Sequence, residues 1–379
     1  MKSLDTARVA LVHDWLTGMR GGEKCLEVLC RRFPAAKLYT LLHAKGALSP
    51  AIERMAIRPS WLNRLPGIVS HYRYTLPLMP FAANWPVRDC DLLVSFSHAV
   101  AKAATPPPGV PHVCYCFTPM RYAWHMRESY FAGRLGGLKS VAVNKLLAAI
   151  RAWDRRTAAR VTHFIAISKT IQGRIKESYG RDSVVIYPPV DTDFYTPDPA
   201  VPREDYYLIL SAFAPYKRVD LAIEACRRLG KRLVIIGSGQ DAARLKAMAG
   251  PTAEFLGWKP NEELRSHLRR CRALLFPGEE DFGIVPVEAN ACGTPVIAYA
   301  KGGATETVTP WGRPKPTGFW FADQTVDSVV AAIEACEREH GNLTVEDARE
   351  KALTFDQRRY ESELLGYLGT VLGEKQRYF

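Results

Sequence analysis

Residues 273–304 read ALLFPGEEDFGIVPVEANACGTPVIAYAKGGA. The apolar run Ala273–Phe276 leads into a loop of glycine and acidic residues, and a helical pattern then separates it from a second apolar run, Pro295–Ala298. Short apolar runs that alternate with helices are typical of βαβ units on a parallel sheet. In such sheets ligands bind at the carboxyl ends of the strands, so we expect chemistry in the loop that follows Phe276.

The same rhythm continues through most of the 379 residues. Further runs rich in Val, Ile and Leu are Val9–Val12, Leu92–Phe96, Val113–Cys116, Phe164–Ile167, Val184–Ile186, Tyr207–Ser211, Leu233–Ile236 and Ala253–Leu256. A proline-rich stretch at 187–199 interrupts them and suits an interdomain linker. The sequence therefore predicts an α/β protein with two Rossmann-like, doubly wound domains, at 1–190 and 191–355. A helical tail at 356–379 carries an apolar stripe that needs a partner, which we expect on the first domain.

Charge divides unevenly between the two halves. Residues 1–190 hold 27 Lys and Arg against 11 Asp and Glu, a net charge of +16, whereas residues 191–379 hold 24 against 28, a net charge of −4. A basic domain favours an anionic partner such as an anionic lipid, a phosphorylated acceptor or nucleic acid, although a basic surface that only aids solubility fits equally well. The scattered cysteines and the short apolar run near the N-terminus indicate a cytoplasmic protein, soluble or peripheral at the membrane.

Two other segments have competing interpretations. Residues 61–85 mix basic side chains with many aromatic and aliphatic ones, which fits either a surface that dips toward lipid headgroups or a helical hairpin packed on the sheet. Asp191 and Asp193 imitate a metal-binding D-x-D pair, but they lie in the linker, where a turn and helix cap is the better interpretation.

The loop after Phe276 carries the strongest candidate site. Glu280 lies in the loop and Glu288 lies about a turn inside the following helix. Between them, the amides of Phe282, Gly283 and Ile284 would stand at a helix N-terminus, which attracts anions. A pyrophosphate held there, with carboxylates accepting hydrogen bonds from sugar hydroxyls, is the chemistry that this pattern indicates. Helix capping by acids in the first turn is the structural alternative.

Other strand ends of the second half add basic residues and glycines. Lys217 and Arg218 follow the run Tyr207–Ser211, where they are placed to neutralise a diphosphate, with solvated surface charge as the alternative. Gly237 and Gly239 follow the next run, and tight turns alone also require glycine.

Taken together, these segments resemble the family 4 glycosyltransferases of the GT-B fold, in which two Rossmann-like domains face each other across a cleft. The E-x7-E pattern of 280–288, PYKRVDLAIEA and VIIGSGQ occur in the expected order. The resemblance implies that Glu280 contacts the donor sugar, that Glu288 holds the ribose hydroxyls and that Lys217 binds phosphate. It also places the segment FLGWK, which ends at Lys259, against the base of the nucleotide. The resemblance implies neither a cofactor nor a required metal.

In the first domain the resemblance implies an acceptor site. Residues 11–23, LVHDWLTGMRGGE, match the first strand and glycine-rich loop of the family, so Asp14 would bond acceptor hydroxyls, and Gly21 and Gly22 would let backbone approach the donor phosphates. The segment CYCFTPMRYAW, which contains Arg121, resembles CHTPMRYAW of bacterial O-antigen and polysaccharide mannosyltransferases.

The chain departs from the family pattern at two positions. Ala212 stands where many members have an arginine, and Arg218 would replace that arginine only if its side chain turned inward. Phe117 stands where many members have a histidine. His98, at another strand end, would replace this polar group, or it is a histidine at a helix start without a role.

The resemblance implies a retaining glycosyltransferase that transfers a hexose, with mannose from GDP-mannose as the leading donor. The acceptor is expected to be lipid-linked or an oligosaccharide in cell-surface polysaccharide assembly, at the inner face of the plasma membrane. The alternatives are a UDP-sugar-dependent transferase, a sugar-nucleotide epimerase and a non-catalytic nucleotide-sugar-binding protein. Nucleic acid is not an expected partner, because it leaves the E-x7-E loop without a purpose.

Overall fold

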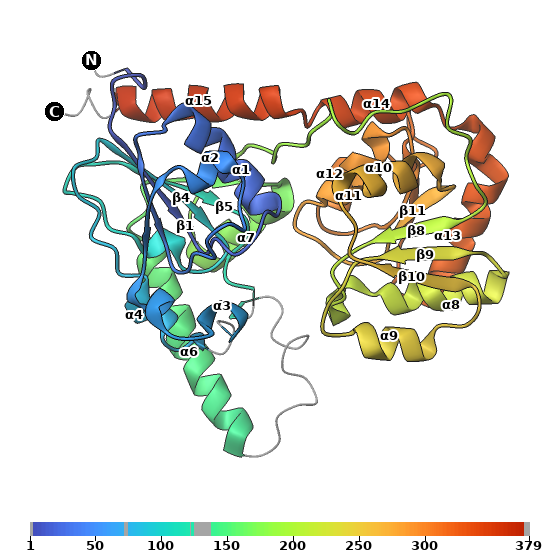
Figure 1. Cartoon of the computed structure of the whole chain (residues 1–379), viewed down its shortest axis with the longest axis horizontal. Coiled ribbons are helices and arrows are strands. Elements are labelled where there is room, and N and C mark those ends of the chain that lie inside the picture. Colours follow the sequence, from blue (N-terminus) through green and yellow to red (C-terminus); the bar gives the residue numbers. More distant parts are fainter. Residues whose placement is uncertain (1–2, 72–74, 122, 125–137, 375–379) are drawn as a thin grey trace. The chain divides into compact units, whose positions relative to one another are not determined.

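The computed structural model describes residues 3–71, 75–121, 123–124 and 138–374. They form two compact units, one of residues 1–188 with 360–379 and the other of residues 189–359 (Figure 1). Each unit contains one parallel sheet with helices on both faces. The predicted α/β fold with two Rossmann-like domains is confirmed.

The sheet of the first unit has seven strands in the order β3-β2-β1-β4-β5-β6-β7. Their bounds are β1 Val9–His13, β2 Lys37–Thr40, β3 Ala56–Pro59, β4 Leu92–Ser97, β5 His112–Cys116, β6 His163–Ala166 and β7 Val184–Val185. The chain winds outward in one direction through β2 and β3 and in the other through β5, β6 and β7. The strand order therefore reverses between β1 and β4, which is where such sheets hold ligands.

Helices cover both faces of this sheet. They are α1 Gly21–Arg32, α2 Pro50–Glu53, α3 Ile68–His71, α4 Met79–Ala82, α6 Leu138–Ala158, α7 Lys169–Tyr179 and α15 Gln357–Glu374. From Tyr360 onward α15 packs within the first unit: the Tyr360 hydroxyl donates to the Cys25 carbonyl at 3.2 Å, and its ring stands edge-on to Tyr115 at 5.7 Å. Leu364 and Leu368, one and two turns further along, are also fully buried.

The sheet of the second unit has six strands in the order β10-β9-β8-β11-β12-β13. Their bounds are β8 Tyr207–Leu210, β9 Leu233–Ile236, β10 Ala253–Gly257, β11 Ala273–Phe276, β12 Val296–Tyr299 and β13 Gly318–Phe321. The helices are α8 Val219–Leu229, α9 Ala242–Met248, α10 Asn261–Arg270, α11 Ile284–Ala291, α12 Ala304–Thr307, α13 Val326–Glu339 and α14 Val345–Leu353. Here the strand order reverses between β8 and β11.

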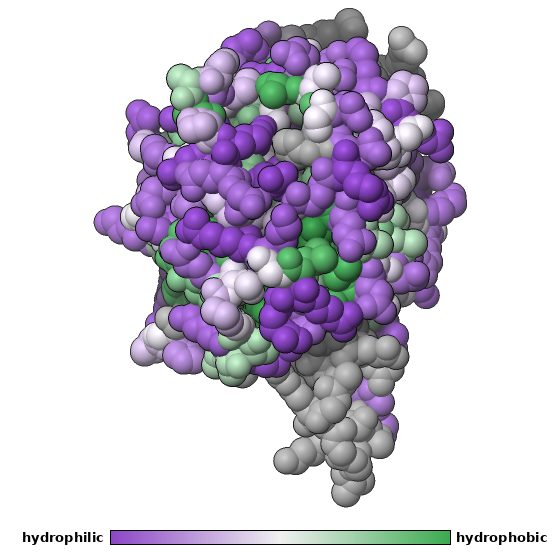
Figure 2. All heavy atoms as spheres, turned by 90° about the vertical axis from the view of Figure 1, so that its right-hand side faces the viewer, coloured by the Kyte–Doolittle hydropathy of each residue, from purple (hydrophilic) through white to green (hydrophobic). Residues whose placement is uncertain are grey.

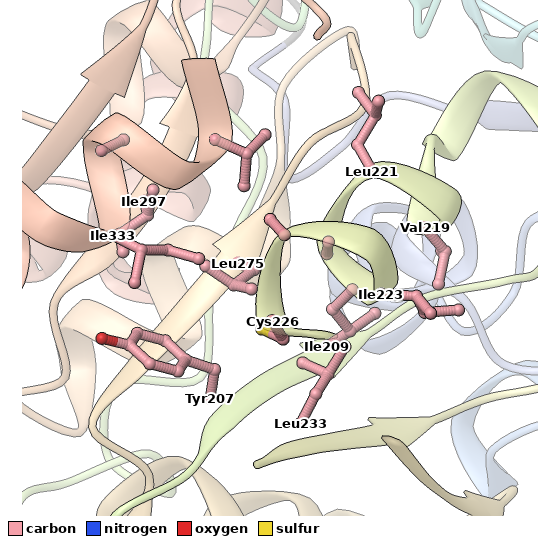
Figure 3. Packing of buried hydrophobic residues seen from close by; sticks show 14 of the residues in the cluster. Tyr207, Ile209, Val219, Leu221, Ile223, Cys226, Leu233, Leu275, Ile297 and Ile333 are labelled. Carbon is pink, nitrogen blue, oxygen red and sulfur yellow. The ribbon is translucent and has the colours of Figure 1, made fainter. Parts of the chain in front are cut away.

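One core of the second unit lies between the sheet and helices α8 and α13. Ile223 and Cys226 of α8, Ile333 of α13, and Ile209 and Leu275 of the central strands belong to one buried cluster (Figure 3). Seen from outside, the unit presents a mostly hydrophilic face in which hydrophobic side chains form only small areas (Figure 2). The packed core holds the central strands in register, so the loops at their carboxyl ends have fixed starting points.

Residues 61–85 are divided between the core of the first unit and its surface. Leu62, Ile68, Met79 and Trp85 belong to the core of the first unit. Four other apolar residues, which we call the apolar rim, are exposed: Trp61, Leu65, Leu78 and Phe81. The segment forms short helical turns rather than one hairpin of long helices, and Arg73 lies outside the described residues. Among the helices that the structure describes, none is long and apolar enough to cross a membrane.

Candidate active site

Lys217 and Glu280 form an ion pair at the point where the strand order of the second unit reverses. Lys217 ends a 3₁₀ turn, Pro215–Lys217, that follows β8, and Glu280 lies in the loop after the neighbouring strand β11. Gly278 lets the two loops approach, since a Cβ atom there would lie 2.9 Å from the Lys217 Cα. The side chains are 13% and 20% exposed, so the pair is shielded yet open to a ligand on one side.

Helix α11 begins directly after this pair. Gly283, its N-cap, has φ +86°, a left-handed conformation that favours glycine. Phe282 is buried with its ring edge-on to Phe355 at 5.4 Å, and Ile284 is the first helical residue. Glu288 lies one turn into the helix and is only 6% exposed. The positive end of the helix and two carboxylates therefore lie along one short segment, as the E-x7-E spacing predicted.

Glycines hold the Glu280 loop through close backbone contact. The Gly303 amide donates to the Glu280 carbonyl at 2.7 Å. A Cβ atom would lie 2.2 Å from the Glu280 carbonyl oxygen if placed on Gly302, and 2.2 Å from the Phe282 Cα if placed on Gly303. Both distances are far below contact, so a side chain at either position would displace the loop. Gly302 and Gly303 therefore shape the site through their backbone, since glycine has no side chain that could contact a ligand.

Gly237 and Gly239 have the same kind of role on the other side of β8. A Cβ atom at Gly237 would lie 1.8 Å from the Ser211 carbonyl oxygen, and one at Gly239 would lie 2.4 Å from that of Phe213. These glycines are required by the packing of two neighbouring loops. Their contribution to donor binding stays a prediction.

Arg218 is placed differently from the expectation that it turns inward to bind diphosphate. It has φ +51° and is the N-cap of α8. Its guanidinium group pairs with Asp220 at 3.1 Å and donates to the Gln324 carbonyl at 3.5 Å. The guanidinium group is thus engaged with Asp220 in the first turn of α8 and with Gln324 after β13. A contribution of Arg218 to diphosphate binding stays a prediction. Lys259, after β10, pairs with Glu263 at 2.7 Å, beside the 75% exposed Trp258.

In the first unit the structure brings Asp14 and His98 together. Asp14 follows β1 and is fully buried. Its carboxylate accepts the backbone amides of residues 98–101 at 2.5 to 2.9 Å, and His98 Nδ1 lies 2.8 Å from Oδ2. A carboxylate engaged in this way has no exposed oxygen for an acceptor hydroxyl. The expected direct contact of Asp14 with the acceptor is therefore corrected: Asp14 positions the turn that carries His98.

The electrostatics of Asp14 predict a pH dependence of stability. Burial alone would raise its pKa, but the charge and hydrogen bonds of His98 and its amide lower the pKa below its usual value. Because the folded-state pKa is depressed, the ionised carboxylate stabilises the fold at neutral pH, and this contribution is lost as the pH falls below about 4.

We therefore expect Asp14→Asn to lower the free energy of unfolding at pH 7, and the difference from the wild type to shrink toward pH 3. Urea unfolding at several pH values measures this difference. Asp327→Asn, which breaks an exposed pair with Arg228, is the control and should show no comparable pH-dependent difference. A deficit of Asp14→Asn that stays constant from pH 7 to pH 3 would contradict the assignment.

Phe117 follows β5 and lines the same edge of the sheet. Its ring lies 6.2 Å from that of His98 and 6.3 Å from that of His13. Gly22, in the first turn of α1 that begins at Gly21, allows this approach, because a Cβ atom there would lie 3.2 Å from the Phe117 ring. Arg121 is partly buried in the turn that follows. The roles of Gly21, Gly22 and Arg121 in binding stay predictions.

The first unit also contains a buried ion pair that the sequence did not indicate. Lys102 pairs with Asp154 of α6, and Trp124 and Tyr179 each donate to the second Asp154 oxygen at 2.8 Å. Burial would lower the pKa of Lys102, but Asp154 raises it above its usual value. The partners lie 52 residues apart, so no local pattern marks them.

Family models match both units. Residues 19–194 match the model of Glycosyltransferase Family 4, and residues 194–352 match the model of Glycosyl transferases group 1.

Curated relatives match only in part. A GDP-mannose-dependent alpha-(1-6)-phosphatidylinositol monomannoside mannosyltransferase of Mycolicibacterium smegmatis is 33% identical over 197 residues, which are 44% of this chain and 50% of that protein. An uncharacterized glycosyltransferase of Methanocaldococcus jannaschii is 32% identical over 149 residues, 38% of this chain and 42% of that protein. The chain thus spans half or less of the length of these relatives.

Solved structures share the fold over nearly the whole chain. HepE of Anabaena in complex with UDP is similar with a TM-score of 0.69 and 17% identity, covering 96% of this chain and 100% of that one. Sucrose-phosphate synthase of Thermosynechococcus elongatus has a TM-score of 0.71 and 15% identity, covering 97% and 100%. These structures show that the chain has the GT-B fold. The two family models, which together extend from residue 19 to residue 352, place it among the family 4 glycosyltransferases.

Proposed function

We propose that this protein is a retaining glycosyltransferase that transfers a hexose from a nucleotide diphosphate donor, without a required metal ion, to a lipid-linked or oligosaccharide acceptor in cell-surface polysaccharide assembly. The observation that carries the proposal is the shielded Lys217–Glu280 pair beside helix α11, which contains the buried Glu288. These residues offer a cation, a helix N-terminus and two carboxylates at one edge of the sheet.

Each of these groups suits one part of such a donor. Lys217 and the N-terminus of α11 supply positive charge where a diphosphate becomes more negative as it leaves. Glu280, oriented by Lys217, accepts hydrogen bonds from hydroxyls of the donor sugar, and Glu288 accepts them from the ribose. Because Lys217 and the helix supply the positive charge, we propose that catalysis does not depend on a divalent cation.

GDP-mannose is the proposed donor. The mycobacterial relative at 33% identity carries this donor in its name. A UDP-sugar is the second candidate, because structures similar to this chain include Anabaena HepE in complex with UDP-glucose. The residues around the diphosphate suit either nucleotide, since they address phosphate and hydroxyl groups that both donors share.

The proposed acceptor is presented at the inner face of the plasma membrane. Two features of the first unit support this: residues 1–190 carry a net charge of +16, and the apolar rim holds exposed aromatic side chains, with Phe81 73% exposed. Basic residues and exposed aromatics together suit an anionic lipid surface. Co-sedimentation with anionic vesicles, lost at high salt, is the expected result, and equal binding to neutral vesicles would contradict it.

Product analysis tests the proposed activity. The protein is incubated with GDP-mannose, UDP-glucose or ADP-glucose and a lipid extract as acceptor, with and without EDTA. Transfer from GDP-mannose that EDTA does not change, with the donor's anomeric configuration kept in the product by NMR, is expected. Conversion of the donor sugar into its epimer without an acceptor product would instead favour the epimerase, and no turnover of any donor would contradict the proposal.

A further inference from the structure

His98 occupies the central edge of the first sheet. It follows β4 directly, whereas Asp14 follows the neighbouring strand β1 and Phe117 follows β5 on the other side. The carboxyl ends of these three parallel strands lie side by side where the strand order reverses. In an open α/β sheet this is the position at which a ligand is held, so a polar side chain here is placed to contact one.

The turn that carries His98 is fixed from two sides. The Asp14 carboxylate accepts the four amides of residues 98–101, and Lys102, itself paired with the buried Asp154, donates to the Ala99 carbonyl at 2.8 Å. A side chain on such a turn is held in place before a substrate arrives. The buried network therefore serves the position of His98 as well as stability.

The ring of His98 is oriented by its own contacts. Nδ1 lies 2.8 Å from the Asp14 carboxylate, which can only accept a hydrogen bond, so Nδ1 carries the proton and Nε2 is the acceptor nitrogen of the neutral ring. Trp15 stands edge-on to the ring at 4.4 Å, and the side chain is 32% exposed. The geometry thus combines a fixed tautomer with access to solvent.

We propose that His98 is a catalytic residue of the acceptor site, in an inference that rests on the transferase function proposed above. Its Nε2 accepts the hydrogen bond of the attacking acceptor hydroxyl. As the acceptor oxygen bonds the anomeric carbon on the face from which the diphosphate departs, which retains the configuration, the bond from that carbon to the diphosphate oxygen breaks. The diphosphate leaves with the electron pair, and the hydroxyl proton moves to Nε2. Asp14 stabilises the resulting imidazolium, which returns the proton to solvent.

The neighbouring side chains are unsuited to this role. Phe117 has no group that accepts a proton. His13, the other titratable side chain beside Asp14, is 1% exposed, and its Nε2 is buried without a hydrogen-bond partner among the described residues. Burial lowers the pKa of His13, which keeps its ring neutral. His98 is thus the group with both a basic nitrogen and access to an acceptor.

His98→Asn separates the catalytic role from a structural one. The asparagine amide occupies the place of Nδ1 and continues to donate to Asp14, but it has no counterpart of Nε2. We expect kcat for transfer to fall by ~10²-fold or more, the size typical of a lost acid–base group, while KM for the donor and the melting temperature stay unchanged. The matched control is His43→Gln, at another histidine–carboxylate pair, with Glu53, and it should keep wild-type kcat.

The test begins with wild-type protein and the donor that supports transfer. A His98→Asn variant with kcat within threefold of the wild type would overturn the proposal for His98 while leaving the transferase function intact. Absence of transfer by the wild type with every nucleotide sugar would instead contradict the proposed function itself. A fall in kcat that is accompanied by a lower melting temperature would also overturn the proposal for His98, because it would show a structural role.

Discussion

Lys217→Ala is expected to lower kcat/KM for sugar transfer by ~10²–10³-fold, the loss typical when one group that stabilises developing negative charge is removed. Lys217 is partly buried, paired with Glu280 and adjacent to the N-terminus of α11. Its removal takes away the cation nearest the proposed diphosphate and leaves Glu280 without its partner. Because the charge on the diphosphate grows as the bond breaks, kcat should fall more than donor affinity.

Steady-state kinetics with varied donor concentration measure this effect. Lys231→Ala is the matched control, since Lys231 lies in the same unit and pairs with Glu337 at 3.4 Å, away from the loops after β8 and β11. It should keep wild-type kcat/KM. A Lys217→Ala enzyme with kcat/KM within threefold of the wild type would show that the Lys217–Glu280 pair does not act on the donor.

Asp154→Asn is expected to produce the largest loss of stability, about 3–5 kcal/mol in the free energy of unfolding, as when one partner of a buried ion pair is removed. Lys102 is 1% exposed and Asp154 is 0% exposed. Without the carboxylate, the Lys102 ammonium group stays in the core without its counter-charge. The asparagine amide keeps only one oxygen, so it cannot accept both from Lys102 on one side and from Trp124 and Tyr179 on the other.

Urea unfolding of the whole chain, followed by the fluorescence of its tryptophans, measures the change. The double variant Lys102→Met/Asp154→Leu provides the comparison, because replacing both charges with apolar groups should cost much less than removing one. Equal destabilisation by the single and the double variant would show that shape, and not the unpaired charge, sets the cost. An Asp154→Asn protein as stable as the wild type would contradict the buried pair altogether.

Much of the fold follows from local sequence patterns. The central strands are continuous apolar runs, because both faces of a parallel sheet are covered, and these runs were placed within a residue or two. Three strands were missed. The segment β3 lies at the edge of the first sheet with β2 beside it, and each contains a charged residue and exposed positions. These interrupt the apolar pattern that marks a strand. The segment β13, GFWF, is mostly buried, but a four-residue apolar run is too short to indicate a strand by itself.

The candidate site also has one part that local sequence predicts and one part that it does not. The E-x7-E segment lies within one loop and one helix, so its spacing alone brings Glu280 and Glu288 to one end of α11. Asp14 and His98 are 84 residues apart, and their pairing arises from the adjacency of β1 and β4. The sequence indicates that both residues are polar and that each follows a strand. It does not show that the carboxylate of Asp14 is buried against the backbone amides of the turn that carries His98. The sequence therefore predicted an acceptor contact for Asp14, whereas in the structure its carboxylate is buried against the turn that carries His98.

Thermal unfolding with nucleotides tests most directly the claim that the second unit holds a nucleotide sugar at Lys217, Glu280 and Glu288. GDP, UDP, ADP and their sugar conjugates are compared, with and without EDTA, on the wild type, on Glu288→Ala and on the control Glu254→Ala, which alters an exposed pair with Arg232. A ligand at 100 times its Kd adds about 2.7 kcal/mol to the stability of the folded state.

The account predicts that GDP and GDP-mannose raise the melting temperature of the wild type and of Glu254→Ala by several degrees, that EDTA has no effect, and that Glu288→Ala shows no rise. A rise with UDP conjugates alone would keep the site and change the donor. No rise with any nucleotide, or an undiminished rise in Glu288→Ala, would contradict the donor site.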